Sequence, residues 1–120
     1  MIFIGNDIVE ISRVSRLINK YDQKFINKIF STNEINSFKK KNALNTISGK
    51  FAAKEASAKA LMSSRIVKRV SFKDIEILSY SSGAPFVQLN NIPEKRIKDF
   101  KISISHTDQY ATAVALIEIF

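Results

Sequence analysis

An alanine-rich run in the middle of the chain constrains the fold more than any other stretch. Residues 51–61 read Phe-Ala-Ala-Lys-Glu-Ala-Ser-Ala-Lys-Ala-Leu. Alanine and lysine are among the strongest helix formers, and nothing in the run breaks a helix. We therefore predict a helix from about Asn45 or Thr46 to Ser63, slim enough along its alanines for another backbone or a ligand to approach closely. Gly49, inside this range, marks a second point of close approach.

Three charged residues, Lys54, Glu55 and Lys59, are set into this helix. Glu55 and Lys59 are four positions apart, so their side chains share one helix face. One interpretation is a surface ion pair, which contributes roughly 0.2–0.5 kcal/mol. The other is a functional site, because a face that is half apolar and half charged suits neither a core nor an ordinary solvent-exposed surface. The run alone leaves both interpretations open.

Length and composition favour one globular domain over residues 1–120, since 45% of the residues are hydrophobic and the chain is long enough for a small core. The chain has no cysteine, which excludes a disulfide framework and thiol nucleophiles and fits a reducing compartment. The N-terminus lacks the features of a signal peptide. No apolar run approaches the roughly 20 residues needed to cross a bilayer. We therefore expect a cytoplasmic protein without a membrane partner.

The net charge of +8 implies an acidic partner, which could be a nucleic acid, a membrane, a phosphate-rich small molecule or an acidic protein. The charge is concentrated in the first third of the chain. There, residues 11–21 have the apolar periodicity of an amphipathic helix. Arg13, Arg16 and Lys20 follow one another at spacings of three and four on an adjacent stripe of this helix. Such a stripe is either a solvated face or a docking surface.

The rest of the N-terminal half predicts one strand and two short helices. Residues 1–9 begin as an apolar strand, which we expect to end in a turn at Gly5-Asn6-Asp7, where Asp7 would serve as a turn or cap residue. Residues 25–30 suggest a helical turn. Ser31 and Glu34 then form a capping box, followed by a helix from Thr32 to about Lys41 whose end is marked by Lys39, Lys40 and Lys41.

The C-terminal half changes to β-strand character. Two short apolar runs, at residues 75–77 and 86–89, flank a turn at 81–83 and predict a hairpin. Residues 101–107 alternate as a strand does, after a possible helical turn at 93–98. The chain returns as a long strand over residues 110–119, whose alanines at 111, 113 and 115 share one face and should pack on the alanine-rich helix. We therefore predict an α+β fold in which an antiparallel sheet packs on a long Ala-rich helix.

Three separated motifs resemble one enzyme family. They are Gly-Asn-Asp-Ile-Val-Glu at residues 5–10, Phe-Ala-Ala-Lys-Glu-Ala with Lys-Ala at 51–60, and Ser-Ile-Ser-His-Thr with Tyr-Ala at 103–111. Together they are similar to the 4′-phosphopantetheinyl transferases of the holo-acyl-carrier-protein synthase type, along essentially the whole chain. The resemblance implies a 4′-phosphopantetheinyl transferase-like fold. It also implies transfer of 4′-phosphopantetheine from coenzyme A to a serine of apo-acyl-carrier protein, in support of fatty acid biosynthesis.

The resemblance also implies a specific role for each of the site residues. Asp7 and Glu55 match the metal-binding acids of the family, and their hard oxygen ligands suit Mg²⁺. Lys59, one helical turn beyond Glu55, is expected to neutralise the diphosphate, so these three residues are the expected catalytic set. The remaining expected contacts to coenzyme A come from Lys50, Lys54, Arg65, His106 and Thr107.

The basic first third matches the surface with which this family binds its acidic carrier protein, here through Arg13, Arg16 and Lys20. The family is typically a homotrimer with sites between subunits. The chain departs from the family pattern at residues 62–65, where Met-Ser-Ser-Arg replaces a Gly-Thr-Gly turn. Two interpretations of Arg65 stay open: it compensates by contacting a phosphate of coenzyme A, which its planar guanidinium suits, or it is a solvated loop residue.

The competing class is a small basic module that binds RNA, since net charge alone permits it. The sequence has no aromatic stacking motif of an RNA-recognition sheet and no glycine-rich basic loop. We therefore expect no nucleic-acid partner. Magnesium-dependent binding of coenzyme A would distinguish a transferase from a nucleic-acid module.

Overall fold

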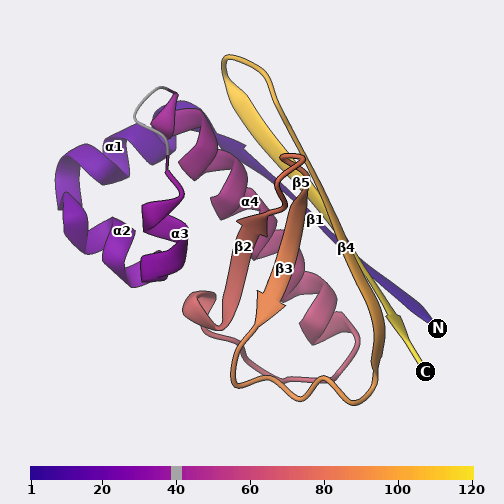
Figure 1. Ribbon diagram of the computed structural model, residues 1–120. Coiled ribbons are helices and arrows are strands. Elements are labelled where there is room, and N and C mark those ends of the chain that lie inside the picture. The colour runs from indigo at the N-terminus through magenta and orange to yellow at the C-terminus, as the bar shows by residue number, and fades with distance from the viewer. Residues whose placement is uncertain (39–41) are drawn as a thin grey trace.

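The computed structural model describes residues 1–38 and 42–120, which form five helical segments and five strands (Figure 1). In chain order they are β1 (Ile2–Glu10), α1 (Ile11–Tyr21), α2 (Gln23–Ile29), α3 (Thr32–Asn36), α4 (Ala43–Ser63), the 3₁₀ helix η1 (Phe72–Asp74), β2 (Ile75–Ser79), β3 (Pro85–Leu89), β4 (Ile97–His106) and β5 (Tyr110–Ile119). None of the helices described is both long and apolar enough to span a membrane.

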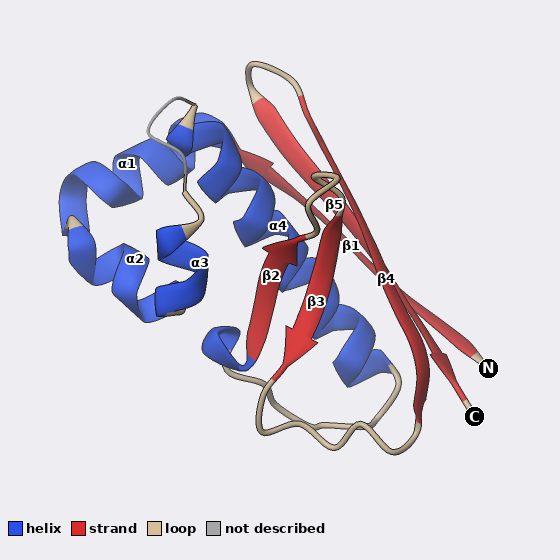
Figure 2. Cartoon of the chain, in the orientation of Figure 1, coloured by secondary structure: helices blue, strands red, loops and turns tan. Residues whose placement is uncertain are grey.

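The long helix α4 lies between a three-stranded antiparallel sheet and the shorter helices α1–α3 (Figure 2). The sheet has the strand order β1-β5-β4, and β2 and β3 form a separate two-stranded antiparallel hairpin. The predicted α+β fold, with an antiparallel sheet packed on an Ala-rich helix, is therefore confirmed. Ala111, Ala113 and Ala115 of β5 are all buried on the face that contacts α4, as the sequence predicts.

The turn expected at Gly5-Asn6-Asp7 is wrong, because β1 continues through these residues and pairs with β5 without interruption. Gly5 serves close packing instead. A Cβ atom at this position would lie 2.0 Å from the carbonyl oxygen of Ala56 and 2.8 Å from the amide nitrogen of Ala60. The glycine therefore lets the backbone of β1 lie directly against the backbone of α4, and Asp7 becomes a strand residue that faces this helix.

The predicted helix over residues 11–21 and the capping box of Ser31 and Glu34 are both confirmed. The Ser31 side chain accepts a hydrogen bond from the Glu34 amide, and the Glu34 carboxylate accepts one from the Ser31 amide. The predicted extension of this helix to about Lys41 is wrong, because α3 already ends at Asn36 and Ser37 is its C-cap. The predicted end signal, Lys39, Lys40 and Lys41, lies outside the described residues.

The β half differs from the prediction in one connection. The helical turn expected over residues 93–98 is wrong, because β4 already begins at Ile97, where it pairs with Ile119 of β5. The hairpin turn is confirmed: Gly83 has a φ of +92°, a conformation that glycine adopts without a steric penalty. Pro85 begins β3, as a proline at a strand start should.

The face of the sheet opposite α4 exposes a row of apolar side chains. Ile2, Ile4 and Ile8 of β1 are between 53% and 63% exposed, and Val114 of the neighbouring β5 is 46% exposed. Alternation along β1 explains the row, because every second residue points away from α4.

Candidate active site

The structure brings Asp7, Glu55 and Lys59 together between β1 and α4. The Lys59 ammonium donates to Oδ1 of Asp7 at 3.0 Å and to the carbonyl oxygen of Asn6 at 3.0 Å. The second carboxylate oxygen of Asp7, Oδ2, is buried and has no hydrogen-bond partner among the described residues. A buried carboxylate oxygen without a partner is costly, so this atom points to a ligand.

Glu55 lies beside Asp7, and the pair behaves electrostatically as two carboxylates that compete for one proton. Burial, and then the adjacent carboxylate of Asp7, raise the pKa of Glu55 to about 7, against the opposing effects of Lys59 and Arg13. Two adjacent carboxylates favour either a shared proton or a bound cation. The hard oxygens and the unpaired Oδ2 of Asp7 therefore fit a divalent metal ion such as Mg²⁺, which typically takes one or two protein carboxylates together with waters and substrate phosphates.

A groove of about 430 Å³ opens between the first half of α4, the β2–β3 hairpin and the end of β4. His106 and Lys50, two residues expected to contact coenzyme A, both line it, as do Ser79, Gly83 and Pro85 of the hairpin. The Lys50 ammonium donates to the Ser37 hydroxyl at 2.7 Å and to the Ile77 carbonyl at 2.8 Å. The structure thus gathers polar and cationic side chains in this groove, apart from the hollow that Asp7 and Lys59 line.

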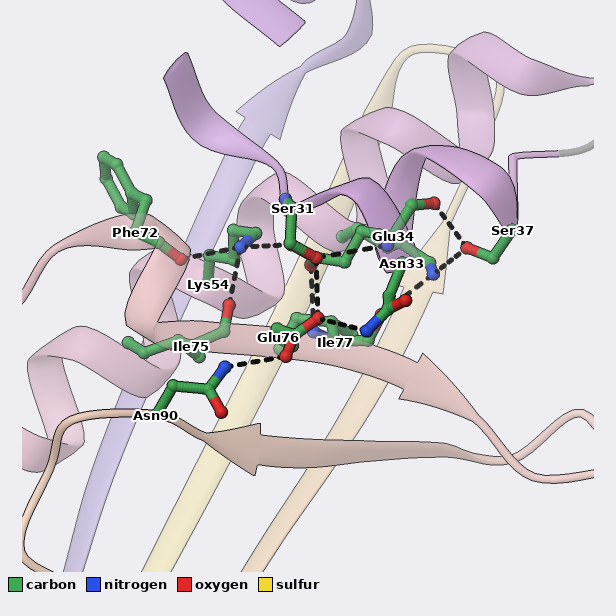
Figure 3. Close-up of polar contacts among 11 residues, drawn as sticks. Ser31, Asn33, Glu34, Ser37, Lys54, Phe72, Ile75, Glu76, Ile77 and Asn90 are labelled. Atoms are coloured by element: carbon green, nitrogen blue, oxygen red, sulfur yellow. Dashed lines mark hydrogen bonds and ion pairs between the residues drawn. The ribbon is translucent and has the colours of Figure 1, made fainter. Parts of the chain in front are cut away.

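The prediction that Lys54 contacts coenzyme A is wrong, because its side chain is fully buried and its ammonium is directed at groups of the protein itself (Figure 3). The ammonium is 2.7 Å from Oε1 of Glu34 and donates to the carbonyl oxygens of Phe72 at 2.7 Å and Ile75 at 2.5 Å. These contacts use all three donors of the ammonium. The capping-box pattern predicts only a helix-cap role for Glu34 and gives no sign of this ion pair, which joins residues twenty positions apart in the chain.

Two further residues were expected to contact coenzyme A. Arg65 lies away from the groove, and Thr107 takes part in a local turn. Arg65 follows the C-terminal end of α4, is exposed and has a φ of +63°. It is fifteen residues beyond Lys50, which along a helix corresponds to roughly 22 Å, so one chain does not bring Arg65 to the groove. Thr107 stabilises the β4–β5 turn, where its hydroxyl accepts hydrogen bonds from the amides of Gln109 and Tyr110.

Arg13, Arg16 and Lys20 are all exposed on α1, as expected. Arg13 is close enough to Glu55 to act on the proton affinity of its carboxylate, so the basic stripe begins beside the acidic pair. Near the other end of α1 is a groove of about 730 Å³, which the sequence analysis missed. Its lining combines apolar side chains with two lysines: Leu17, Tyr21, Lys24, Phe25, Lys28 and Phe72 are among them.

Comparison with known proteins identifies the class to which this fold and site belong. Residues 3–115 match the family model of the 4′-phosphopantetheinyl transferase superfamily. The chain belongs to this superfamily.

Individual relatives agree with this assignment. The chain is 45% identical over 124 residues to the holo-[acyl-carrier-protein] synthase of Clostridium botulinum, covering 97% of this chain and 96% of the relative. It is 41% identical over 116 residues to the enzyme of that name from Protochlamydia amoebophila, covering 94% of each. Among solved structures, the Helicobacter pylori holo-[acyl-carrier-protein] synthase in complex with coenzyme A has a TM-score of 0.82 and 37% identity, covering 96% of this chain and 99% of that one.

Proposed function

We propose that this chain is a holo-acyl-carrier-protein synthase. It transfers 4′-phosphopantetheine from coenzyme A to a serine hydroxyl of apo-acyl-carrier protein and releases adenosine 3′,5′-bisphosphate. The observation that carries this proposal is the partly buried pair of Asp7 and Glu55 beside the Lys59 ammonium in a member of this superfamily. Relatives named holo-[acyl-carrier-protein] synthase, one of them solved with coenzyme A, support the substrate assignment.

Asp7 and Glu55 would together hold Mg²⁺. When bound, the metal supplies positive charge to the diphosphate of coenzyme A, whose oxygens gain charge as the phosphate link breaks. Lys59 is half exposed and already oriented toward Asp7, so its ammonium would bind the same diphosphate. These three side chains make the site electrostatically complementary to the leaving group and leave the serine nucleophile to come from the partner protein.

Coenzyme A would place its nucleotide part in the groove lined by Lys50 and His106, with Thr107 at the rim. Arg65 lies toward the opposite end of α4 from this groove, so a coenzyme A molecule that reaches both His106 and Arg65 would fit a site assembled from two copies of the chain. The exposed apolar row of Ile2, Ile4, Ile8 and Val114 supports such an assembly, since a contiguous apolar patch marks an interaction surface. A homotrimer with sites between subunits fits both observations.

The acidic carrier protein would dock on α1 through Arg13, Arg16 and Lys20. Because α1 follows β1 without a break, and Arg13 is near Glu55, a carrier bound to this stripe would bring its serine to the acidic pair. The apolar groove beyond Leu17, with Lys24 and Lys28 at its side, offers a surface for apolar side chains of the same partner. A cytoplasmic location and a single domain over residues 1–120 stay predictions.

The direct test is to incubate the protein with coenzyme A, MgCl₂ and apo-acyl-carrier protein and to follow the mass of the carrier. We expect the carrier to gain one phosphopantetheine group, and addition of a chelator to stop the gain. Asp7→Asn is the matched control, since it keeps the side-chain shape and removes the charge. An unmodified carrier in the presence of Mg²⁺ and a folded protein would refute the proposal.

A further inference from the structure

In the part of the chain that the structure describes, one edge of β2 has no strand beside it, although its backbone is buried. β3 pairs with β2 on the other edge, and the two strands form a sheet of their own. In an antiparallel pair, alternate residues direct their amide and carbonyl groups away from the partner strand. In β2 these residues are Ile75 and Ile77, both fully buried. A buried backbone group without a partner is costly, so this edge must be satisfied by something other than a strand.

Side chains from α3 and α4 satisfy this edge almost group by group (Figure 3). The Ile75 carbonyl accepts from Lys54 at 2.5 Å, the Ile77 amide donates to Oε2 of Glu34 at 2.9 Å, and the Ile77 carbonyl accepts from Lys50 at 2.8 Å. The Ile75 amide donates locally to the Phe72 carbonyl. Donor and acceptor thus alternate along the edge as they would on a neighbouring strand.

The spacing of these side chains explains how two helices can imitate a strand. Lys50 and Lys54 are one helical turn apart on α4 and therefore point to the same side. Their ammonium groups reach carbonyls of Ile77 and Ile75, which are separated by one strand repeat of roughly 6.6 Å. Glu34 enters between them from α3, and its other carboxylate oxygen contacts Lys54 at 2.7 Å. A second contact joins α3 to β2: the carboxylate of Glu76 accepts a hydrogen bond from the Ser31 hydroxyl at 2.6 Å.

Stability alone does not explain charges at this place. Glu34 and Lys54 are fully buried, and burial lowers the pKa of Lys54, although the contact with Glu34 opposes this effect. A buried ion pair is often no more stabilising than apolar residues of similar size. What the charged set provides is a defined hydrogen-bond partner for each of these backbone groups, which apolar side chains could not supply.

We propose that Glu34, Lys50 and Lys54 substitute for a strand on this edge and act as positioning residues for the coenzyme A groove. The β2–β3 hairpin supplies one wall of that groove through Ile77, Ser79, Gly83 and Pro85, and α4 supplies the opposite wall. Within the described residues the hairpin has no strand ladder to the three-stranded sheet. β3 packs against β4, and the side-chain edge is the hydrogen-bonded connection that sets the position of β2 against α4. The positioning role rests on the proposed binding of coenzyme A in this groove.

The test uses the double variant Glu34→Leu/Lys54→Met, which removes both charges of the ion pair together; Lys50 keeps its hydrogen bonds to Ser37 and Ile77 and loses only the more distant charge of Glu34. Lys73→Met is the matched control, because Lys73 is an exposed lysine of the adjacent η1. We expect hydrogen exchange in residues 75–89 to become at least roughly tenfold faster, with β1 and β5 unchanged. We also expect a roughly tenfold higher KM for coenzyme A and an unchanged KM for the carrier protein. If the double variant does not fold, Glu34→Gln, which keeps the side-chain shape, is measured in the same way.

Unchanged exchange in the hairpin would overturn the strand substitution. Faster exchange with an unchanged KM for coenzyme A would overturn the positioning role, provided that His106→Ala raises that KM. If His106→Ala also leaves it unchanged, the groove is not the coenzyme A site, and the positioning role falls with that part of the proposed function. The exchange measurement still decides the strand substitution in that case, so the two failures are distinguishable.

Discussion

Replacement of Gly5 by alanine should be among the most damaging single-methyl changes that this chain can undergo. The new Cβ atom would lie 2.0 Å from the Ala56 carbonyl oxygen and 2.8 Å from the Ala60 amide nitrogen. Both neighbours are backbone atoms of a helix, so no side chain can rotate away. To reach even 3.0 Å, β1 and α4 must separate by about 1 Å at this point, a lower bound given by the difference between 3.0 and 2.0 Å.

The energetic cost should exceed that of ordinary overpacking. Extra methyl groups in a packed core typically cost about 1–3 kcal/mol when neighbouring side chains can adjust. Here the adjustment must displace a helix that packs on β1 along most of its length, so we expect a loss of at least about 3 kcal/mol in the free energy of unfolding. Asp7 is two residues from Gly5 and faces the same helix, so the separation would also move it away from Glu55 and Lys59. Transfer activity should fall more than the folded fraction does.

The assay combines urea denaturation with transfer activity measured where the variant is folded. Gly49→Ala is the control, since its Cβ would meet only the Cγ2 methyl of Ile104 at 3.0 Å. A few tenths of an ångström of side-chain movement relieves this contact, while alanine gains up to about 1 kcal/mol over glycine in a helix interior. We expect Gly49→Ala to lie within about 1 kcal/mol of the parent. Equal stabilities for the two variants would refute the close-packing argument.

Four further predictions concern the acidic pair and the basic residues around it. Asp7→Asn and Glu55→Gln should each abolish most transfer while the protein remains folded by circular dichroism; near-normal activity of both at low magnesium would exclude the metal site. Because burial and Asp7 raise the pKa of Glu55 from 4.5 to about 7, the folded protein binds more protons than the unfolded chain between these values. The stability of the metal-free protein should therefore fall as pH rises from about 4.5 to about 7, and Glu55→Gln should flatten this slope in urea titrations. Arg13→Glu or Arg16→Glu should weaken carrier binding and its salt dependence without changing the calorimetric affinity for coenzyme A, and loss of that affinity would place α1 in the nucleotide site. Arg65→Gly should relieve the positive φ, worth roughly 1 kcal/mol, yet weaken coenzyme A binding; unchanged binding would make Arg65 a solvated residue.

Local patterns in the sequence predicted most elements of this fold. The Ala-rich helix, the capping box at Ser31, the glycine turn before Pro85 and the alternating strands all depend on interactions within a few residues of one another, and the structure confirms them. The bounds of α1 and β5 agree with the predicted ranges. The prediction of a turn at Gly5 is wrong because the reason for a glycine there is not local. A side chain at this position would collide with α4, about fifty residues away in the chain.

The same limit explains the outcome at the candidate site. The motif resemblance predicted that Asp7 and Glu55 belong to one site, and the structure places them side by side. The resemblance could not show that Lys54 is buried and Lys59 exposed. Both are lysines on one helix, and the sequence does not show which side of that helix other elements cover. Glu34, the partner of Lys54, fits the capping-box pattern fully. The pattern therefore does not indicate that Glu34 also forms an ion pair.

The three consecutive residues Lys54, Glu55 and Ala56 show why α4 lacks the single apolar stripe of a surface helix. Successive side chains point about 100° apart around a helix, so these residues face three different neighbours. Lys54 reaches the β2 edge, Glu55 meets Asp7, and the backbone at Ala56 contacts Gly5. The residues one turn away repeat the pattern, with Lys50, Lys59 and Ala60 on the corresponding sides. If α4 were rotated so that each residue took the place of the next, Glu55 would lie against Gly5. Ala58 would then take the place of Lys59 beside Asp7. The motif therefore fixes the helix in the one orientation that completes the core, the β2 edge and the proposed metal site together.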